Sequence, residues 1–222
     1  MQPDAWVFDL DGTLVDTVGT RIEAWLRTFE EQHIPADRAL VASLIGSDGR
    51  RLARVVAEAA GQSLDSDREE EIDRRAGDNF SALNLGPRIL PGALELLQAL
   101  DESRTRWAIA TSSRREQVDA SIKALARSTR PIVVDGSTVA HAKPAPDLLL
   151  FAARELGVEP SRCCYVGDAI WDMQAAAAAG MPAIGVVSGS ATAGELAAAG
   201  ALFTVKDLTG LIPLGRTQPH TP

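Results

Sequence analysis

Two aspartates stand two residues apart directly after a short apolar segment near the start of the chain. The segment from Ala5 to Asp9 has the length of a strand, and Asp11 and Gly12 follow it in the sequence FDLDG. Because alternate side chains of an extended chain point the same way, both carboxylates can project into a crevice at the end of that strand. Gly12 lets the backbone turn tightly there. Paired carboxylates suit phosphoryl transfer, in which one attacks phosphorus and the other moves a proton to or from the leaving oxygen.

Further polar residues stand at or near the ends of later apolar segments. Thr111 ends one such segment and Ser112 follows it. Asp168 ends another, and Asp172 comes one helical turn later on the same face. Lys143 is a cation placed directly before the helix-like segment PAPDLLLFAARELG. Since the carboxyl ends of parallel strands meet at one edge of a sheet, we expect these residues to converge.

This set of residues could bind a metal ion and a phosphoryl group. Asp9, Asp168 and a backbone carbonyl would give oxygen ligands to a hard cation such as Mg²⁺. Lys143 and Thr111 would hold the remaining phosphoryl oxygens. Structural alternatives remain: Asp168 can cap a helix, and Thr111 can be an ordinary β-branched strand residue. Asp172 and Lys143 can lie in solvent.

The elements that must position these residues alternate between strands and helices. Such alternation predicts an α/β fold with a mostly parallel sheet and helices on both of its faces. The expected strands lie near 5–9, 107–111, 131–135, 163–167 and 182–187, and the expected helices near 92–100, 115–125, 144–157 and 172–179.

One long segment interrupts the alternation directly after the first strand. It contains amphipathic helices and no convincing strand, and Asp16 and Thr17 are candidates to cap its first helix. Because it leaves from the carboxyl edge of the sheet, it is placed to act as a lid. The expected domains are therefore a core of residues 1–15 and 86–212, a helical cap of residues 16–85 and a loose tail of residues 213–222.

Four segments, DLDGTLVD, IATSS, KPAPD and GDAIWD, occur in this order with a helical insert after the first. In order and spacing the chain resembles the haloacid dehalogenase-like hydrolases, in particular their phosphoglycolate phosphatase and β-phosphoglucomutase branch. The resemblance implies a Rossmann-like core and a cap that excludes water when it closes. It also implies a Mg²⁺-dependent phosphatase that acts on small phosphorylated metabolites through an aspartyl-phosphate.

The resemblance assigns roles to the residues of the four segments. It makes Asp9 the nucleophile and Asp11 the general acid and base. Thr111, Ser112 and Lys143 would bind phosphate. Mg²⁺ would be held by Asp9, the carbonyl of Asp11 and Asp168, and Asp172 would orient Lys143 or a metal-bound water.

Several alternatives differ in chemistry. Dehalogenases lack an aspartate at the position of Asp11, and phosphonoacetaldehyde hydrolases need a cap lysine that residues 16–85 do not contain. β-Phosphoglucomutases carry a cap histidine at the position of Arg21, which weakens the mutase interpretation. A receiver-type signalling domain uses a similar set of acids with Thr and Lys, but the large insert favours turnover.

In the segment IGSDGRRL, either Arg50 or Arg51 contacts an anionic part of the substrate, or both are solvated arginines at a helix start.

Composition limits the remaining function classes. The chain has 222 residues, 45% of them hydrophobic, and a net charge of −8. That charge argues against a nucleic-acid surface, which needs clustered Lys and Arg. No apolar stretch reaches the length of a membrane span, so we expect a cytoplasmic protein. The adjacent Cys163 and Cys164 are expected to be buried and unpaired. The substrate and the oligomeric state stay open.

Overall fold

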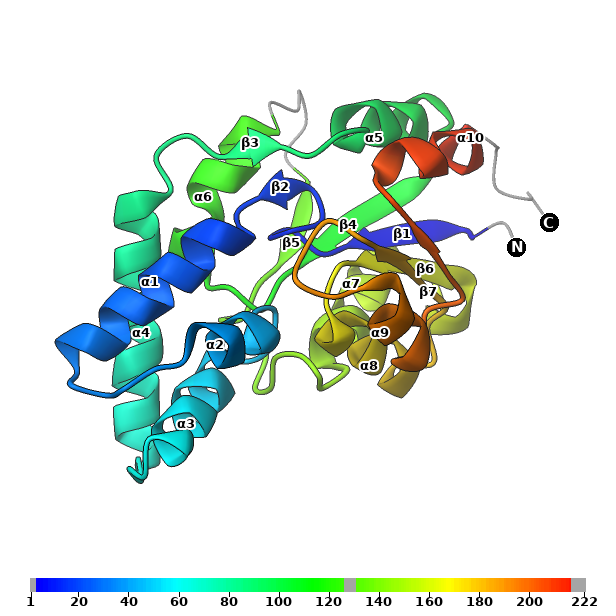
Figure 1. Cartoon of the computed structure of the whole chain (residues 1–222). Coiled ribbons are helices and arrows are strands. Elements are labelled where there is room, and N and C mark those ends of the chain that lie inside the picture. Colours follow the sequence, from blue (N-terminus) through cyan, green and yellow to red (C-terminus); the bar gives the residue numbers. More distant parts are fainter. Residues whose placement is uncertain (1–2, 126–130, 217–222) are drawn as a thin grey trace.

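The computed structural model describes residues 3–125 and 131–216. Its centre is a parallel six-stranded sheet in the order β5-β4-β1-β6-β7-β8 (Figure 1). This arrangement confirms the predicted α/β fold. The strands are β1 (Ala5–Phe8), β4 (Arg106–Ala110), β5 (Ile132–Val134), β6 (Cys163–Gly167), β7 (Ala183–Val186) and β8 (Phe203–Val205).

Helices cover both faces of the sheet. Alternate residues of the central strand β1 point to opposite sides and are buried against these helices. Ala5 and Val7 pack with helices α7, α8 and α9, whereas Trp6 and Phe8 pack with α5 and α6. In Figure 1 these two groups of helices lie on opposite faces of the sheet. The core helices are α5 (Ala93–Glu102), α6 (Arg115–Ala124), α7 (Asp147–Leu156), α8 (Ile170–Ala178), α9 (Ala193–Ala198) and α10 (Ile212–Gly215), with 3-10 turns η1 (Pro160–Arg162) and η2 (Leu208–Leu211).

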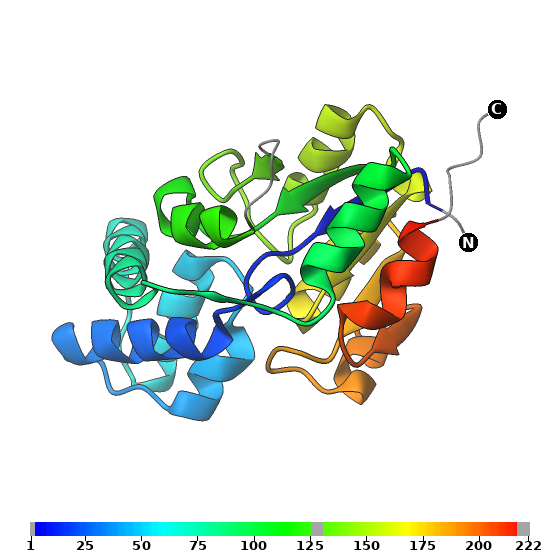
Figure 2. The same ribbon diagram turned by 90° about the horizontal axis from the view of Figure 1, so that it is seen from above.

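A helical cap lies beyond the carboxyl end of the sheet (Figure 2). It contains α1 (Val18–Glu31), α2 (Arg38–Leu44), α3 (Gly49–Ala59) and α4 (Ser66–Leu83). The chain crosses between cap and core at an antiparallel pair, β2 (Val15–Asp16) and β3 (Arg88–Ile89). The apolar core of the cap extends to Trp171, which follows the end of β6 in the sheet domain. The cap is therefore packed against the edge where the predicted site residues end their strands.

Some elements differ from the sequence prediction. The prediction lacked β8, α2 and α9, and it placed residues 213–222 in a loose tail. The tail prediction is wrong for its first residues, because α10 is helical and a Cβ on the buried Gly215 would come within 2.9 Å of Leu96. Residues 217–222 lie outside the described residues.

Cys163 and Cys164 are buried and free, as the sequence predicts. No helix among the described residues is long and apolar enough to span a membrane.

Candidate active site

Lys143 occupies the centre of a buried cluster at the carboxyl edge of the sheet. Its side chain has no exposed surface, and its ammonium contacts the carboxylates of Asp9 and Asp172, the latter at 2.8 Å. It also donates to the Tyr165 hydroxyl at 3.0 Å, and that hydroxyl donates to Asp172 at 2.8 Å. Lys143 is thus fixed between Asp9, which directly follows β1, and Asp172, which lies in the first turn of α8 after β6.

Asp168 and Asp172 are held by the turn that joins β6 to α8. One oxygen of Asp172 accepts the backbone N–H groups of Asp168 and Ala169 at 3.1 and 2.9 Å, at the start of the helix. Asp168 accepts a hydrogen bond from the Thr13 hydroxyl at 2.7 Å. Burial raises the pKa of Asp168 well above its usual value, and the charges of Asp172 and Asp9 add to the effect. An ionised Asp168 therefore needs more positive charge than its protein neighbours supply.

The acids of this cluster fit a divalent cation. Asp9, Asp168 and Asp172 each offer one carboxylate oxygen within 4.8 Å of the others. When all three are ionised, the single ammonium of Lys143 leaves an excess of two negative charges. The space beside Asp168 also requires glycine, because a Cβ on Gly189 would stand 1.7 Å from one of its oxygens. Buried carboxylate oxygens with excess negative charge are suited to Mg²⁺.

Asp11 lies in a separate set of contacts. It accepts hydrogen bonds from Thr17 at 2.6 Å, Arg21 at 2.8 Å and Ser113 at 3.0 Å. Burial opposes its ionisation, but the Arg21 guanidinium and these hydrogen bonds outweigh burial and lower the pKa of Asp11. Thr17 stands at the N-cap position of α1, one of the two candidates, but its side chain makes no cap hydrogen bond and its hydroxyl donates to Asp11 instead.

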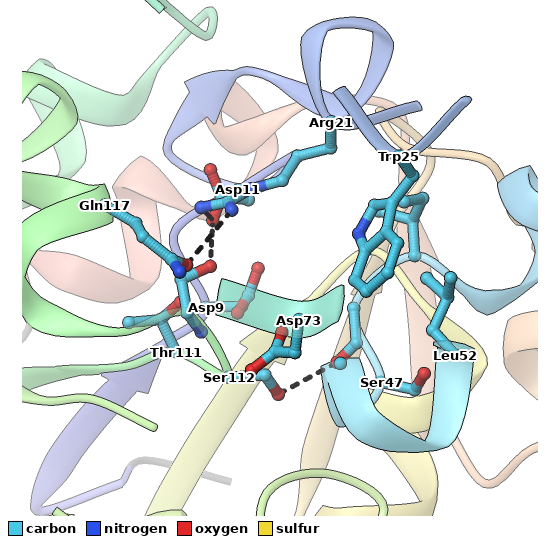
Figure 3. Close-up of a pocket in the computed structure, with 14 residues that line it drawn as sticks. Asp9, Asp11, Arg21, Trp25, Ser47, Leu52, Asp73, Thr111, Ser112 and Gln117 are labelled. Atoms are coloured by element: carbon cyan, nitrogen blue, oxygen red, sulfur yellow. Dashed lines mark hydrogen bonds and ion pairs between the residues drawn. The ribbon is translucent and has the colours of Figure 1, made fainter. Parts of the chain in front are cut away.

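Asp9 is shifted in the opposite direction. The pKa of Asp9 is raised to about 7, chiefly by burial, against which the charge of Lys143 acts, and the charges of Asp172 and Asp11 add to the rise. Both aspartates line a cavity of about 50 Å³ between the sheet edge and the cap (Figure 3). The structure therefore places two carboxylates with different electrostatic surroundings at one cavity.

Comparison with known proteins decides the family. The model of the haloacid dehalogenase-like hydrolases matches residues 3–180. The chain belongs to this family. A phosphoglycolate phosphatase of Rhodospirillum rubrum is 32% identical to it, across 98% of this chain and 93% of the relative. The β-phosphoglucomutase of Bacillus subtilis is 32% identical, across 83% and 84%. A solved hydrolase structure from Pseudomonas syringae has a TM-score of 0.88 at 32% identity, across 94% and 96%.

Membership makes the chain an enzyme of a hydrolase family with relatives named as phosphatases, and it confirms the resemblance found in the four segments. The roles of single residues in this haloacid dehalogenase-like hydrolase stay predictions.

Thr111 is buried, lines the cavity and accepts the N–H of Ser113 through its hydroxyl at 3.2 Å. The Ser112 hydroxyl donates to the Gly46 carbonyl of the cap at 3.0 Å. Ser112 thus links core and cap.

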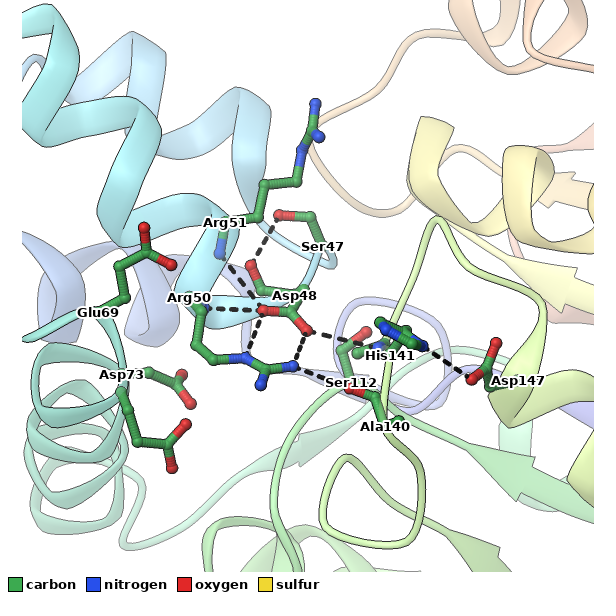
Figure 4. A network of polar contacts seen from close by, with 12 residues as sticks. Ser47, Asp48, Arg50, Arg51, Glu69, Asp73, Ser112, Ala140, His141 and Asp147 are labelled. Atoms are coloured by element: carbon green, nitrogen blue, oxygen red, sulfur yellow. Dashed lines mark hydrogen bonds and ion pairs between the residues drawn. The ribbon is translucent and has the colours of Figure 1, made fainter. Parts of the chain in front are cut away.

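The arginines predicted to meet substrate lie in another groove. Arg50 donates to Asp48 at 2.9 Å and to the Ala140 carbonyl at 3.1 Å (Figure 4). The Arg51 guanidinium lies 5.0 Å from the centre of the Trp171 ring. Neither is among the described residues that line the cavity of Asp9. Substrate contact by Arg50 or Arg51 stays a prediction that this conformation does not support.

Sequence reasoning missed two side chains of the site. The sequence predicts Tyr165 only as a buried residue of a strand, yet its hydroxyl contacts Lys143 and Asp172. Arg21 lines the cavity from the cap helix α1, with only 8% of its surface exposed. A signal for Arg21 is present, because it stands four residues before Trp25 and so shares the apolar face of that helix.

Proposed function

We propose that the protein is a Mg²⁺-dependent phosphatase that hydrolyses small phosphorylated metabolites, with a specificity like that of phosphoglycolate phosphatases. Asp9 would carry the phosphoryl group as an aspartyl-phosphate. The observation that carries this proposal is the position of Asp9: it lines the cavity and contacts the buried ammonium of Lys143, beside Asp168 and Asp172. A carboxylate oriented in this way is suited to attack on phosphorus.

The proposed reaction has two steps. A carboxylate oxygen of Asp9 attacks phosphorus, the bond from phosphorus to the ester oxygen breaks, and Asp11 in its protonated form gives a proton to that leaving oxygen. In the free site Arg21 lowers the pKa of Asp11, so this step requires Asp11 to take up a proton when substrate binds. Asp11 then takes a proton from water, the water oxygen attacks phosphorus, and the bond to Asp9 breaks to release phosphate. Lys143 and Thr111 hold phosphoryl oxygens during both steps. Mg²⁺ bound by Asp9, the carbonyl of Asp11 and Asp168 would neutralise charge on the phosphoryl group.

The cap would exclude bulk water during the first step. Its loop reaches the core through the Ser112–Gly46 hydrogen bond and through the Asp48 N–H, which donates to the Lys143 carbonyl at 2.8 Å. Cap closure is thereby coupled to the backbone that carries the central lysine. Sequestering the reacting groups strengthens their electrostatic interactions and limits side reactions.

A turnover assay tests this function. With p-nitrophenyl phosphate, 2-phosphoglycolate and Mg²⁺, we expect many equivalents of phosphate per chain, loss of activity with EDTA and recovery with added Mg²⁺. Asp9→Asn is the negative control. Release of at most one equivalent would favour the receiver-type alternative, and interconversion of sugar phosphates without net release would favour the mutase alternative. Full activity in EDTA would contradict the metal requirement.

A further inference from the structure

Arg21 has more hydrogen-bonding capacity than its neighbours use. One of its terminal nitrogens donates to Asp11 at 2.8 Å, and the other lies 3.5 Å from the Gln117 side-chain oxygen, at the limit of a hydrogen bond. Its guanidinium carbon stands 3.5 Å above the centre of the Phe80 ring. Its Nε is buried and has no hydrogen-bond partner in the described part of the chain. A buried donor without an acceptor is unfavourable, so this guanidinium is poised for another acceptor.

The place of Arg21 in the cavity determines what that acceptor can be. The guanidinium contacts Asp11, the residue that protonates the leaving oxygen in the proposed reaction. An anion bound by Arg21 must therefore be attached to the carbon that bears the ester oxygen or to the next carbon. A carboxylate matches the planar guanidinium in shape and charge.

We propose that Arg21 binds a carboxylate on the leaving group, so that the enzyme prefers phosphate esters of small hydroxy acids. This inference rests on the proposed phosphatase function and names its substrate class. The nearby acid Asp73, which also lines the cavity, accepts hydrogen bonds from Arg114 at 3.1 and 3.3 Å. Its charge is thus opposed by a cation of its own, and Arg21 remains available to a substrate anion.

The test compares substrates that differ in one group. They are 2-phosphoglycolate, 2-hydroxyethyl phosphate, in which a neutral hydroxymethyl group replaces the carboxylate, and the bisphosphate of ethane-1,2-diol. Arg21→Gln removes the charge, and Arg21→Lys keeps the charge but not the planar fork. Arg27→Gln, an exposed arginine on the same helix, is the matched control. The readout is the ratio of kcat/KM values for two substrates in one preparation, which does not depend on the folded fraction.

We expect the wild-type enzyme to prefer 2-phosphoglycolate over 2-hydroxyethyl phosphate by roughly 30- to 100-fold. Arg21→Gln should bring this ratio close to one, Arg21→Lys should give an intermediate ratio, and Arg27→Gln should leave it unchanged. An unchanged ratio in Arg21→Gln, with both substrates slowed equally, would show that Arg21 only holds Asp11 and would overturn the proposal. So would a wild-type preference for the bisphosphate that depends on Arg21.

A binding measurement separates this inference from the proposed function. In an Asp9→Asn background, calorimetric titration with 2-phosphoglycolate should show affinity that Arg21→Gln lowers roughly 30-fold or more. Arg21-dependent binding without turnover by the wild-type enzyme would refute the phosphatase function and leave the carboxylate assignment intact. Turnover of phosphate esters with binding that ignores Arg21 would refute the carboxylate assignment alone.

Discussion

Two clusters of the site each place an aspartate beside a buried cation, but the pKa of the aspartate is raised in one cluster and lowered in the other. In the nucleophile cluster, defined as Asp9, Lys143, Asp168 and Asp172, three carboxylates share one ammonium. Burial and the neighbouring acids raise the pKa of Asp9 to about 7. In the acid–base cluster, defined as Asp11, Thr17, Arg21 and Ser113, one carboxylate accepts hydrogen bonds from a guanidinium and two hydroxyls, with no second acid in the cluster. The pKa of Asp11 is lowered, although burial opposes ionisation there too.

Burial raises the pKa of both aspartates, so the opposite directions of their net shifts follow from the number of acids that share each cation. The nucleophile cluster carries excess negative charge that a divalent cation would neutralise. In the acid–base cluster one guanidinium opposes one carboxylate, and two of its residues belong to the start of the cap, Thr17 at the N-cap of α1 and Arg21 within α1. We therefore expect the first cluster to respond to metal and pH, and the second to respond to changes in the cap.

Removal of the shared cation should have the largest effect. Lys143→Met leaves buried carboxylates without their ammonium, so we expect the free energy of unfolding to fall by roughly 3–5 kcal/mol. Loss of a cation that holds phosphoryl oxygens should also lower kcat roughly 10²- to 10³-fold. Denaturant unfolding and steady-state kinetics measure the two effects, with the exposed Lys123→Met as control. A variant as stable as the wild type would show that Lys143 does not balance the cluster.

The excess charge of the nucleophile cluster also predicts a pH effect on the metal-free protein. The pKa of Asp9 is about 7 in the folded state and near 3.8 in an unfolded chain, so the folded state binds the proton more tightly. This contribution to stability is complete below pH 3.8 and is lost as the pH rises through about 7. Relative to Asp9→Asn, the wild-type Tm in EDTA should fall by roughly 5–10 °C from pH 5 to pH 8.

Added Mg²⁺ should reduce this fall, because a bound divalent cation favours the ionised acids. Thermal unfolding at several pH values, with EDTA or Mg²⁺, provides the measurement. If the wild-type Tm in EDTA instead rose relative to Asp9→Asn over this range, Lys143 alone would be stabilising the ionised Asp9.

A substitution in the acid–base cluster should have the smallest effect on kcat. Thr17→Val keeps the shape of the side chain but removes the hydroxyl that donates to Asp11. Since Arg21 and Ser113 still donate, we expect kcat to fall roughly threefold to tenfold and the pKa of Asp11 to rise. A pH–rate profile measures both, with Thr20→Val in the first turn of α1 as control. A loss as large as that of Lys143→Met would show that the two clusters are not separate.

The sequence predicts the nucleophile cluster better than the acid–base cluster for a physical reason. Asp9 and Asp168 directly follow the ends of β1 and β6, and parallel strand ends must meet at one edge. Lys143 lies in the loop before α7, where its place ahead of a helix was the signal. Tyr165 was not predicted because its strand position looks the same whether or not its hydroxyl has a polar partner. Arg21 depends on how the cap packs against the core, a long-range arrangement that residue spacing within one helix does not determine.

The elements that were missed are short and partly exposed. Strand β8 has three residues at the edge of the sheet, and α9 has six residues, most of them alanine or glycine. Neither has the length or alternation that makes hydrophobic periodicity a strong signal. The helix α10 forms where Gly215 packs against α5, which is a tertiary contact that its own sequence does not indicate.

Trapping the covalent intermediate tests the central claim most directly. Enzyme quenched during turnover and treated with borohydride should contain homoserine at position 9, because hydride reduces an acyl-phosphate to the alcohol. Mass spectrometry of the peptide that contains Asp9 would detect this change, and Asp9→Asn should show none. Reduction at another aspartate, or rapid turnover with unmodified Asp9 under conditions that trap a known acyl-phosphate, would contradict Asp9 as the phosphoryl acceptor.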